Sequence, residues 1–373
     1  MKAVAVNPSN REVGLVDHPE PRASRPTDVK LAMLDVGICG TDREICAFDY
    51  GTPPDGSARL VIGHESLGQV LEVGSEVEGL REGDLVVPMV RRPCLHEDCA
   101  ACSAGRQDFC FTGDFHERGI KEAHGFMTER VVDDARYMNV VPGELRDVAV
   151  LVEPLTIAEK ALEQLGQVQM RLPWKVSDRP GAPLGEGHKA VVLGAGPVGL
   201  LGAMALIVNG FETYVYSRSR KPNDKADLVE SLGAKYIAAE DNDAEALAKA
   251  VGNIDVVYEA VGASQIAFEV MKVLGTNGVF VFTGVPGRKA PIQVDTDLLM
   301  RNLVLKNQVV YGTVNAGKST FQHAIRDLGT FMERFPSAVR ALITGRFPIE
   351  AHRELLLGRP TGIKNVIQLG EAG

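Results

Sequence analysis

The sequence predicts an α/β protein of two domains, a β-rich domain followed by a doubly wound parallel sheet. With 373 residues the chain is longer than one ordinary hydrophobic core can serve. Short apolar segments separated by glycines between residues 61 and 88 are typical of β-strands joined by tight turns. At 194–199 a G-x-G-x-x-G turn follows an apolar strand and precedes an apolar helix, which indicates a β-α-β unit of a parallel sheet.

The composition is that of a globular protein and disfavours several classes of partner. Hydrophobic residues make up 45% of the chain and charged residues 24%. The net charge of −9 argues against nucleic acids and anionic membranes. Residues 1–14 lack the apolar segment of a signal peptide, so we expect a cytoplasmic protein. The apolar run 190–211 has the length of a membrane helix, but its glycines and Pro197 divide it into a strand, a turn and a helix.

Two possible metal ligands occur early in the chain, each beside glycine. Cys39 lies between Ile38 and Gly40 on an expected turn. A lone cysteine is usually a buried, unreactive side chain, but the neighbouring Thr41 favours a polar pocket. His64 lies directly before Glu65; by itself such a histidine is more often structural than a ligand.

Four of the six cysteines are close together in the sequence: Cys94, Cys99, Cys102 and Cys110. In a chain without a secretion signal this clustering indicates a metal site rather than a disulfide framework. Their spacings suit four thiolates around a tetrahedral zinc, although His96 offers an alternative to one cysteine. Such a site has no open coordination position, so this metal is expected to be structural.

Two glutamates are candidates for the chemistry. Glu117 lies in a polar loop and is either a substrate-binding carboxylate or an ordinary surface residue. Glu153 precedes Pro154 and is flanked by the apolar Val152 and Leu155, which indicates a buried carboxylate. A buried carboxylate needs a partner, and a metal ion would supply one.

The G-x-G-x-x-G turn predicts a dinucleotide-binding site. The first glycine permits the tight turn, the second lets pyrophosphate approach backbone N–H groups, and the third lets the helix pack on the strand. The expected contacts are Gly194, Gly196, Pro197, Val198 and Gly199.

The end of the following strand bears on the choice of cofactor. NAD-preferring sites usually carry Asp or Glu there, whereas this chain has Ser217, Arg218 and Ser219 followed by two further cations. A hydroxyl and cations suit a 2′-phosphate, so we predict NADP, with NAD also accepted. The alternative is a solvated basic loop.

The remaining elements alternate as a doubly wound sheet requires. Ligands bind outside the carboxyl ends of such strands, so Thr283, Gly284 and Val285 are candidate nicotinamide contacts. Strands are expected at 2–6, 29–36, 189–193, 213–216, 236–238, 254–258, 278–282 and 303–311, with further short strands in 125–141. Helices are expected at 156–165, 225–232, 243–251, 264–274 and 317–334.

Taken in order, these motifs resemble the zinc-dependent medium-chain alcohol dehydrogenases along essentially the whole chain. The segments that carry the resemblance are Gly-Ile-Cys-Gly-Thr-Asp at 37–42, the stretch from Gly63, the cysteine lobe, Glu153-Pro154 and the late dinucleotide turn. Four further segments resemble the glucose 1-dehydrogenase branch: Arg-Arg-Pro at 91–93, Glu-Arg-Gly at 117–119, residues 153–162 and Gly-Thr-Val-Asn at 312–315.

The resemblance implies a GroES-like β domain with catalytic and structural zinc, and a Rossmann domain. The GroES-like domain is expected at 1–155, with the structural zinc lobe at about 91–112, followed by a linker helix and connection at 156–188. The Rossmann domain is expected at 189–315, and the segment 316–373 completes the first domain. It assigns Cys39, His64 and Glu153 to the catalytic zinc, with Glu65 as an alternating or neighbouring ligand. It places Thr41 beside the reacting hydroxyl, and Glu117, Glu153 and Asn315 at the sugar. The expected cofactor contacts are Thr283 to Val285, Thr313, Val314 and Asn315.

The activity implied is NAD(P)-dependent oxidation of an aldose at C1, with D-glucose giving D-glucono-1,5-lactone. The resemblance also implies a homodimer or homotetramer built on the edge strand near 303–310. A polyol or secondary-alcohol dehydrogenase of the same fold is the alternative, and a non-catalytic nucleotide-binding relative is a second one. Two departures from the family pattern are the four residues between Cys94 and Cys99, where two are commoner, and Ser219, where some relatives carry arginine.

Overall fold

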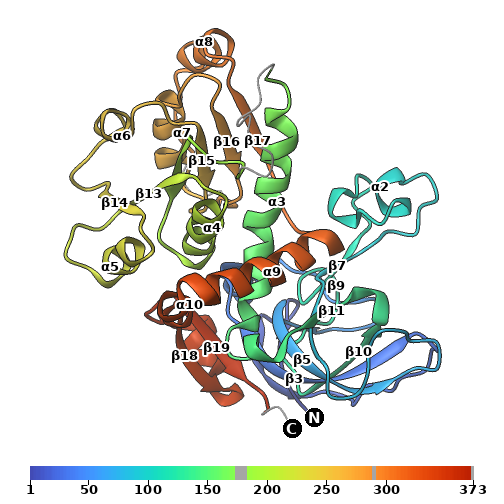
Figure 1. The fold of residues 1–373 in the computed structure, drawn as a ribbon. Coiled ribbons are helices and arrows are strands. Elements are labelled where there is room, and N and C mark those ends of the chain that lie inside the picture. The colour runs from blue at the N-terminus through green and yellow to red at the C-terminus, as the bar shows by residue number, and fades with distance from the viewer. Residues whose placement is uncertain (173–182, 288–290, 371–373) are drawn as a thin grey trace. The chain divides into compact units, whose positions relative to one another are not determined.

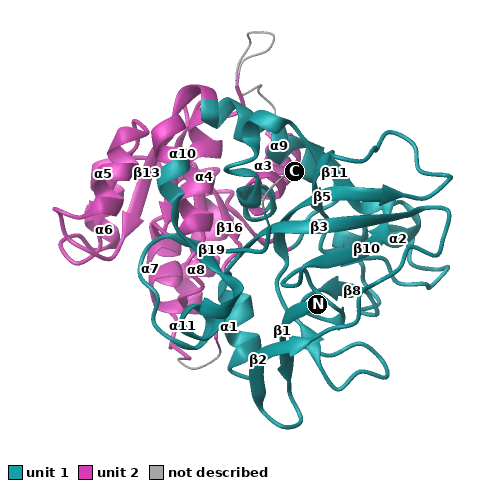
Figure 2. Ribbon diagram, turned by 90° about the horizontal axis from the view of Figure 1, so that it is seen from below, with its two compact units in different colours: residues 1–156, 315–332, 339–373 teal, residues 157–314, 333–338 magenta. Residues whose placement is uncertain are grey.

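The structure, a computed structural model, describes residues 1–172, 183–287 and 291–370. It divides into two compact units, each with its own hydrophobic core (Figure 2). Unit 1 comprises residues 1–156, 315–332 and 339–373, and unit 2 comprises 157–314 and 333–338. The expected linker helix and connection at 156–188 begin within helix α3 (Val152–Gln169), and the segment 173–182 of the connection lies outside the described residues.

Unit 1 is built on a seven-stranded sheet that combines strands from residues 28–141 with two strands from the C-terminal part of the chain (Figure 1). Its central strand β3 (Asp28–Gly37) pairs with β5, β10 and the late strand β19, all antiparallel. The other strands are β5 (Glu65–Val73), β6 (Leu85–Pro88), β10 (Arg130–Asp134), β11 (Met138–Val141), β18 (Ile343–Pro348) and β19 (Lys364–Gln368). Because β19 joins β3 directly, the C-terminal segment completes this sheet.

Two smaller sheets flank the large one in unit 1. The first holds β2 (Glu12–Asp17), β1 (Lys2–Asn7) and β4 (Leu60–Val61), and the second holds β7 (Arg91–Arg92), β8 (His116–Arg118) and β9 (Glu122–Ala123). The helices of this unit are α1 (Gly40–Cys46), α2 (Ala100–Ser103), most of α9 (Lys318–Arg334), part of α10 (Pro336–Leu342) and α11 (His352–Leu357).

Four glycines between residues 61 and 88, namely Gly63, Gly74, Gly79 and Gly83, lie in turns or loops outside the strands, whereas Gly68 lies inside β5. Gly63 has a φ of +89°, in the region that favours glycine, and it lies two residues before the strand β5. A Cβ on Gly74 would lie 2.2 Å from the carbonyl oxygen of Pro26, so a side chain there would prevent the close approach of these two segments.

Unit 2 is a six-stranded parallel sheet with the order β14-β13-β12-β15-β16-β17. This corresponds to the strand order of doubly wound dinucleotide-binding folds, which reverses beside the first strand. The strands are β12 (Lys189–Leu193), β13 (Glu212–Ser217), β14 (Lys235–Ala238), β15 (Val256–Glu259), β16 (Val279–Phe282) and β17 (Val309–Gly312). The helices are α4 (Pro197–Val208), α5 (Asp224–Ser231), α6 (Ala244–Val251), α7 (Ser264–Lys272) and α8 (Thr296–Leu305).

Helices cover both faces of this sheet, which explains why its strands are continuous apolar runs. Val191 and Leu193 belong to the core shared with α6 and α7. Val192 points to the other face, where α4 packs on β12 and β13. Every residue from Ala190 to Leu193 is fully buried as a result.

One predicted element is wrong. We expected a strand over 303–311, but residues 303–305 end the helix α8, and β17 begins at Val309. Asp295 caps that helix, because its Oδ1 accepts a hydrogen bond from the Leu298 N–H at 3.0 Å. The apolar residues 303–305 therefore form the last turn of a helix, and a short apolar run does not by itself separate a helix from a strand.

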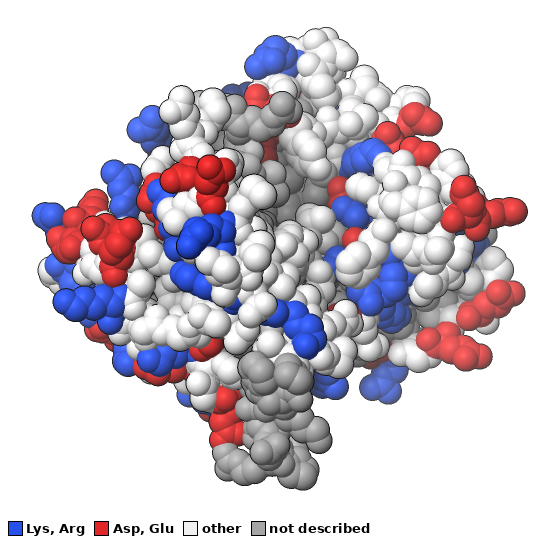
Figure 3. Space-filling view, turned by 90° about the horizontal axis from the view of Figure 1, so that it is seen from above, with Lys and Arg blue, Asp and Glu red and all other residues white. Residues whose placement is uncertain are grey.

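Within the described ranges, none of the helices combines the length and the apolar character needed to cross a bilayer. On the face shown in Figure 3, acidic and basic side chains are interspersed.

Candidate active site and metal centres

Three potential metal ligands converge in unit 1. The Sγ of Cys39, a ring nitrogen of His64 and a carboxylate oxygen of Glu65 all lie within 4.8 Å of one another. Cys39 directly precedes α1, whereas Glu65 begins β5 opposite Gly37 of β3. A Cβ on Gly37 would lie 2.3 Å from Glu65 Oε2, so only glycine leaves room for this carboxylate.

Asp42, in the first turn of α1, holds this group together. Its Oδ2 accepts the backbone N–H of Cys39 at 2.9 Å, and its Oδ1 accepts that of Gly63 at 3.2 Å. The same Oδ1 lies 3.3 Å from His64 Nδ1. A carboxylate against one ring nitrogen orients an imidazole and leaves the other nitrogen for a metal. The sequence motif contained Asp42, but its role as a clamp became evident only from the fold.

The electrostatics of this cluster suit a cation. Burial lowers the pKa of His64, but the Asp42 and Cys39 side chains outweigh burial, and the net pKa is raised well above its ordinary value. Burial and the neighbouring Glu65 together raise the pKa of Glu153 to about 7, although His64 acts in the opposite direction. Carboxylates therefore crowd this cluster. A thiol, an imidazole and a carboxylate are also the donor types that zinc prefers.

Glu153 and Thr41, two further residues predicted for the active site, are not part of the group formed by Cys39, His64 and Glu65. Glu153 is in the first turn of α3 and does not belong to the group whose ligand atoms lie within 4.8 Å, as judged over the described residues. Because the charges of His64 and Glu65 act on the pKa of Glu153, this carboxyl lies near both of them. Thr41 is partly buried in the first turn of α1, two residues after Cys39. Ligation by Glu153 therefore stays a prediction.

Glu65 has a partner that the sequence did not indicate. Lys364 Nζ lies 2.5 Å from Glu65 Oε2, and both side chains are 1% exposed. The same Nζ donates to the carbonyl oxygen of Ile38 at 3.2 Å. Lys364 lies in β19, 299 residues after Glu65, and no local pattern marks it. One oxygen of Glu65 is therefore bound by an ammonium group, which competes with a metal for this carboxylate.

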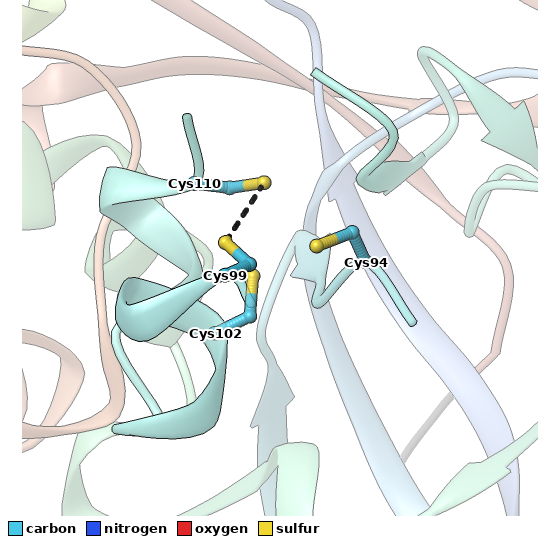
Figure 4. Close-up of side chains that lie close together, drawn as sticks. All are labelled: Cys94, Cys99, Cys102 and Cys110. Carbon is cyan, nitrogen blue, oxygen red and sulfur yellow. Dashed lines mark hydrogen bonds between the residues drawn. The ribbon is translucent and has the colours of Figure 1, made fainter. Parts of the chain in front are cut away.

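The four clustered cysteines form a second group, shown in Figure 4. The sulfurs of Cys94, Cys99, Cys102 and Cys110 lie within 4.8 Å of one another. His96 is engaged elsewhere, because its Nε2 lies 2.5 Å from Asp114 Oδ2 on the surface. The structure thus favours four thiols over the alternative with His96.

Backbone N–H groups favour the thiolates of Cys99 and Cys110, whereas burial and the neighbouring thiols raise the pKa of Cys102 to about 12. Although burial raises the pKa of Cys110, bonds from the Thr112 side chain and from the N–H groups of Thr112 and Gly113 lower it to about 6. The Cys102 and Phe111 N–H groups likewise lower the pKa of Cys99. Thiolates are the form that binds zinc, so the lobe fits a structural zinc ion.

A buried carboxylate lies elsewhere in unit 1. Glu117, on β8, is 5% exposed. Its Oε1 accepts two hydrogen bonds from Arg91, at 3.0 and 2.9 Å, and one from Asn315 Nδ2 at 2.9 Å. The fold thus brings together two residues that the resemblance assigns to a sugar, and it excludes the alternative that Glu117 is an ordinary surface residue. Sequence reasoning did not identify Arg91 as their partner.

The predicted dinucleotide turn in unit 2 has the shape its glycines require. Gly194 has a φ of +97°, and a Cβ on Gly199 would lie 2.2 Å from the Gly194 carbonyl oxygen. Gly196 is the N-cap of α4, with Pro197 and Val198 as the first helical residues. A Cβ on Gly196 would meet nothing within 4 Å, which leaves open space beside the helix N-terminus for a pyrophosphate.

A buried glutamate organises the loops at the carboxyl edge of the sheet. Glu259 Oε1 accepts the N–H groups of Val261 and Gly262, both at 2.8 Å, and its Oε2 accepts that of Gly284 at 3.2 Å. Thr283 Oγ1 donates to the Glu259 carbonyl oxygen at 2.7 Å. The predicted nicotinamide segment is thereby fixed beside the dinucleotide turn. Nothing in the sequence singled out Glu259.

Exposed apolar side chains follow three neighbouring strands at this edge. Val261 is 49% exposed, Val285 71% and Val314 55%, and they follow β15, β16 and β17. Gln164 Nε2 donates to Thr313 Oγ1 at 2.7 Å, which holds the segment before Val314. These valines suit the apolar faces of a nicotinamide nucleotide.

The residues after β13 are arranged for a second anionic group. Ser217 ends the strand, and the Arg218 side chain is 90% exposed, with its Nε 3.6 Å from Glu240 Oε1. The Ser219 carbonyl oxygen accepts the hydroxyl of Tyr236 at 2.8 Å. The Arg218 guanidinium is therefore weakly held and free to turn toward a 2′-phosphate.

Replacing Arg218 by Ala should weaken NADPH binding by about tenfold, because a hydrogen bond between charged groups is worth roughly 1.5–3 kcal/mol. NADH binding should change less than about twofold, because NADH lacks the phosphate. Fluorescence titration with both nucleotides measures the effect. Arg220→Ala is the matched control, since Arg220 Nε is held by Asp241 Oδ1 at 2.6 Å. An equal loss for both nucleotides would contradict the assignment.

Two family models together match nearly the whole chain. The model described as alcohol dehydrogenase GroES-like domain matches residues 25–143, and the one described as glucose dehydrogenase C-terminus matches residues 146–369. Glucose 1-dehydrogenase of Methanocella arvoryzae is 37% identical over 373 residues, covering 99% of this chain and 100% of that protein. Glucose 1-dehydrogenase of Thermoproteus tenax is 39% identical over 373 residues, covering 99% of both.

Solved structures agree with these matches. Glucose dehydrogenase of Haloferax mediterranei, in complex with NADP, Zn and gluconolactone, is 30% identical and has a TM-score of 0.87 over 100% of both chains. Galactitol-1-phosphate dehydrogenase of Escherichia coli has a TM-score of 0.78 over 99% of this chain and 100% of that one, but at 19% identity it supports the fold alone.

Proposed function

Because the chain belongs to the glucose 1-dehydrogenase branch of the zinc-dependent medium-chain alcohol dehydrogenases, we propose that it oxidises an aldose at C1 with NADP or NAD. D-Glucose is the expected substrate and D-glucono-1,5-lactone the product. The C1 hydroxyl loses its proton, and hydride moves from C1 to C4 of the nicotinamide. Family membership over the whole chain supports the reaction type, and the Haloferax mediterranei complex supports the cofactor and the metal.

The observation that carries the sugar assignment is the contact between Glu117 and Asn315. These residues lie 198 positions apart, yet Asn315 Nδ2 donates to Glu117 Oε1 at 2.9 Å. A carboxylate with an accepting oxygen and an amide with a carbonyl offer the directional bonds that sugar hydroxyls require. A site for a simple secondary alcohol has no need of such a pair.

The metal ligands proposed for the reaction are Cys39, His64 and Glu153, with Glu65 as an alternating ligand that Lys364 restrains. When bound, the zinc supplies a Lewis acid that stabilises negative charge on the C1 oxygen. Asp42 fixes the orientation of the imidazole and the backbone of Cys39. The Thr41 hydroxyl acts as a relay, accepting the C1 hydroxyl proton while donating its own proton to solvent water.

In unit 2, the proposed cofactor contacts do the positioning. Gly196 and the start of α4 hold the pyrophosphate, and Arg218 holds the 2′-phosphate. Thr283, fixed by Glu259, and the exposed Val285 and Val314 confine the nicotinamide. Each of these groups acts by binding or orientation rather than by transfer of a proton.

The protein is also proposed to form a homodimer or homotetramer through the edge strand of unit 2. β17 ends the six-stranded sheet, so one side of its backbone lacks a strand partner within this sheet. The preceding helix α8 exposes Met300 to 64%, Val304 to 73% and Leu305 to 64%. Such a patch favours burial against a second copy. Cytoplasmic location is our expectation, and the six unpaired cysteines fit it.

The test is steady-state kcat/KM for glucose, galactose, xylose and sorbitol, each with NADP and NAD. The proposal expects an aldose to exceed sorbitol by about a hundredfold or more, because a site that pairs its buried polar groups with one substrate rejects a mismatched one. Sorbitol as the best substrate would establish the polyol alternative. If the protein carried its full complement of zinc but turned over none of these substrates, the alternative of a non-catalytic nucleotide-binding protein would be favoured.

A further inference from the structure

We propose that Arg91 is a positioning residue for sugar recognition, and that it makes the sugar-binding carboxylate Glu117 depend on the order of the cysteine lobe. Arg91 begins the Arg-Arg-Pro segment, to which neither the reaction nor the metal sites give a role. The inference rests on the proposed function, because it takes Glu117 as a sugar ligand. It extends that function to a residue that need not touch the substrate itself.

Strand pairing places Arg91 and Glu117 face to face. β7 and β8 are antiparallel, with Arg91 opposite Glu117 and Arg92 opposite His116. Side chains opposite one another in such a pair lie on the same face of the sheet. The Arg91 and Glu117 side chains are 7% and 6% exposed, so this ion pair is shielded from solvent. Removing one partner of a buried pair leaves the other without its compensating charge.

The hydrogen bonds select one oxygen of Glu117 and leave the other for a ligand. Arg91 Nε and Nη2 and Asn315 Nδ2 all donate to Oε1. Within the described part of the chain, no donor is bound to Oε2. Three donors on one oxygen fix the plane of the carboxylate, so the free oxygen has a defined direction in which to accept a sugar hydroxyl.

Arg91 itself is held by the lobe. Its Nη1 donates to the Asp108 carbonyl oxygen at 3.4 Å, and the Phe115 ring covers its Cζ at 3.7 Å. Asp108 belongs to the short turn 107–109, which directly precedes Cys110. A metal that binds the Cys110 thiolate therefore restrains the backbone that orients Arg91.

The lobe also contacts the segment that carries Asn315. Arg106 donates to the Asp108 carboxylate at 3.1 and 3.0 Å. A Cβ on Gly317 would lie 3.0 Å from Asp108 Oδ1 and 3.3 Å from Arg106 Nε. Asn315 has a φ of +60°, a conformation that needs support from its surroundings. Both sugar-binding side chains are thus supported by the same turn of the lobe.

The main test replaces Arg91 by Met and by Lys. For Arg91→Met, KM for glucose should rise by about tenfold to a hundredfold while kcat falls less than about threefold, because binding geometry is lost rather than a reacting group. Arg91→Lys should raise KM less than Arg91→Met does, because the ammonium group keeps the positive charge but cannot donate the two parallel hydrogen bonds of the guanidinium. NADPH affinity and zinc content should not change. The thermal shift by glucose in the presence of NADPH, a pair that cannot react, gives a readout without turnover.

Arg92→Met is the matched control. Arg92 is the next residue, and its side chain is similarly buried, with 12% exposure. It forms an ion pair with Asp133, and Asp133 also pairs with Arg118 at 3.0 Å, so its charge remains compensated when Arg92 is replaced. It should leave KM for glucose within about twofold. A double-mutant cycle of Arg91→Met with Glu117→Gln should show that the two losses are strongly non-additive. Additive losses, or equal effects of Arg91→Met and Arg92→Met, would overturn the inference.

Arg106→Gln tests the link to the lobe. It removes the bonds to the Asp108 side chain and should raise KM for glucose by a few fold, an effect that disappears in the Arg91→Met background. An unchanged KM, or the same rise in both backgrounds, would overturn the link. A wild-type protein that oxidises no aldose would refute the proposed function, whereas one that oxidises glucose with an unchanged KM after Arg91→Met would refute only this inference.

Discussion

Replacing His64 by Ala is expected to lower kcat/KM for glucose by at least about a thousandfold, because an imidazole ligand of the metal that stabilises charge on the substrate oxygen is lost. Zinc content should fall from about two ions per chain to about one, since the lobe retains its four thiolates. NADPH affinity should stay within about twofold, because the dinucleotide turn belongs to unit 2 and does not depend on His64. Metal analysis, nucleotide titration and steady-state kinetics measure the three quantities.

His116→Ala is the appropriate control for this variant. His116 is an exposed histidine of the same unit, 3.4 Å from Glu122 Oε2 at the surface. It should retain both zinc ions and full activity. A His64→Ala protein with two zinc ions, or one that keeps its activity after chelation, would contradict the assignment of His64 to the catalytic metal.

The sequence could predict those parts of the site that depend on local chemistry. The turn at 194–199 was predictable because its glycines have separate local requirements, and the close contact of Gly199 with Gly194 confirms one of them. The cysteine lobe was predictable for the same reason, since four thiols within a short segment have few other uses. The convergence of Cys39 and His64 followed from motif order rather than from any local pattern.

The partners that hold these residues could not be predicted. Lys364 is an ordinary lysine at the start of a short strand, and only the pairing of β19 with β3 places its ammonium group beside Glu65. Arg91 reads as a surface cation until β7 pairs with β8. Glu259 ends a buried strand and becomes meaningful only when three backbone N–H groups gather around it. Each depends on tertiary pairing, which composition and periodicity do not encode.

Replacing Cys102 by Ser in the lobe is expected to remove the other zinc ion selectively. Zinc content should again fall from about two to about one per chain, but now the ion that remains is the catalytic one. Binding of structural zinc contributes directly to folding, so proteolysis within 94–110 should become faster. The melting temperature should fall by several degrees, because a loss of about 1–2 kcal/mol in the free energy of unfolding has this effect in a domain of this size.

Cys46→Ala is the matched control for Cys102→Ser. Cys46 is 2% exposed in the core of unit 1 and lies outside both groups of metal ligands found among the described residues. It should keep both zinc ions, and its small change of buried volume should cost about 1 kcal/mol or less. A Cys102→Ser protein that keeps two zinc ions, or loses both, would contradict a separate four-thiolate site.

The two zinc variants together separate chemistry from recognition. His64→Ala removes a group at the reacting atoms, so kcat should fall while glucose still protects the protein. Cys102→Ser leaves Cys39, His64 and Glu65 in place but loosens the turn that holds Arg91 through the Asp108 carbonyl. KM for glucose should therefore rise by about tenfold, with a smaller effect on kcat. If Cys102→Ser lowered stability alone and left KM unchanged, the lobe would be a structural appendage, and the alignment of Glu117 would be independent of its metal.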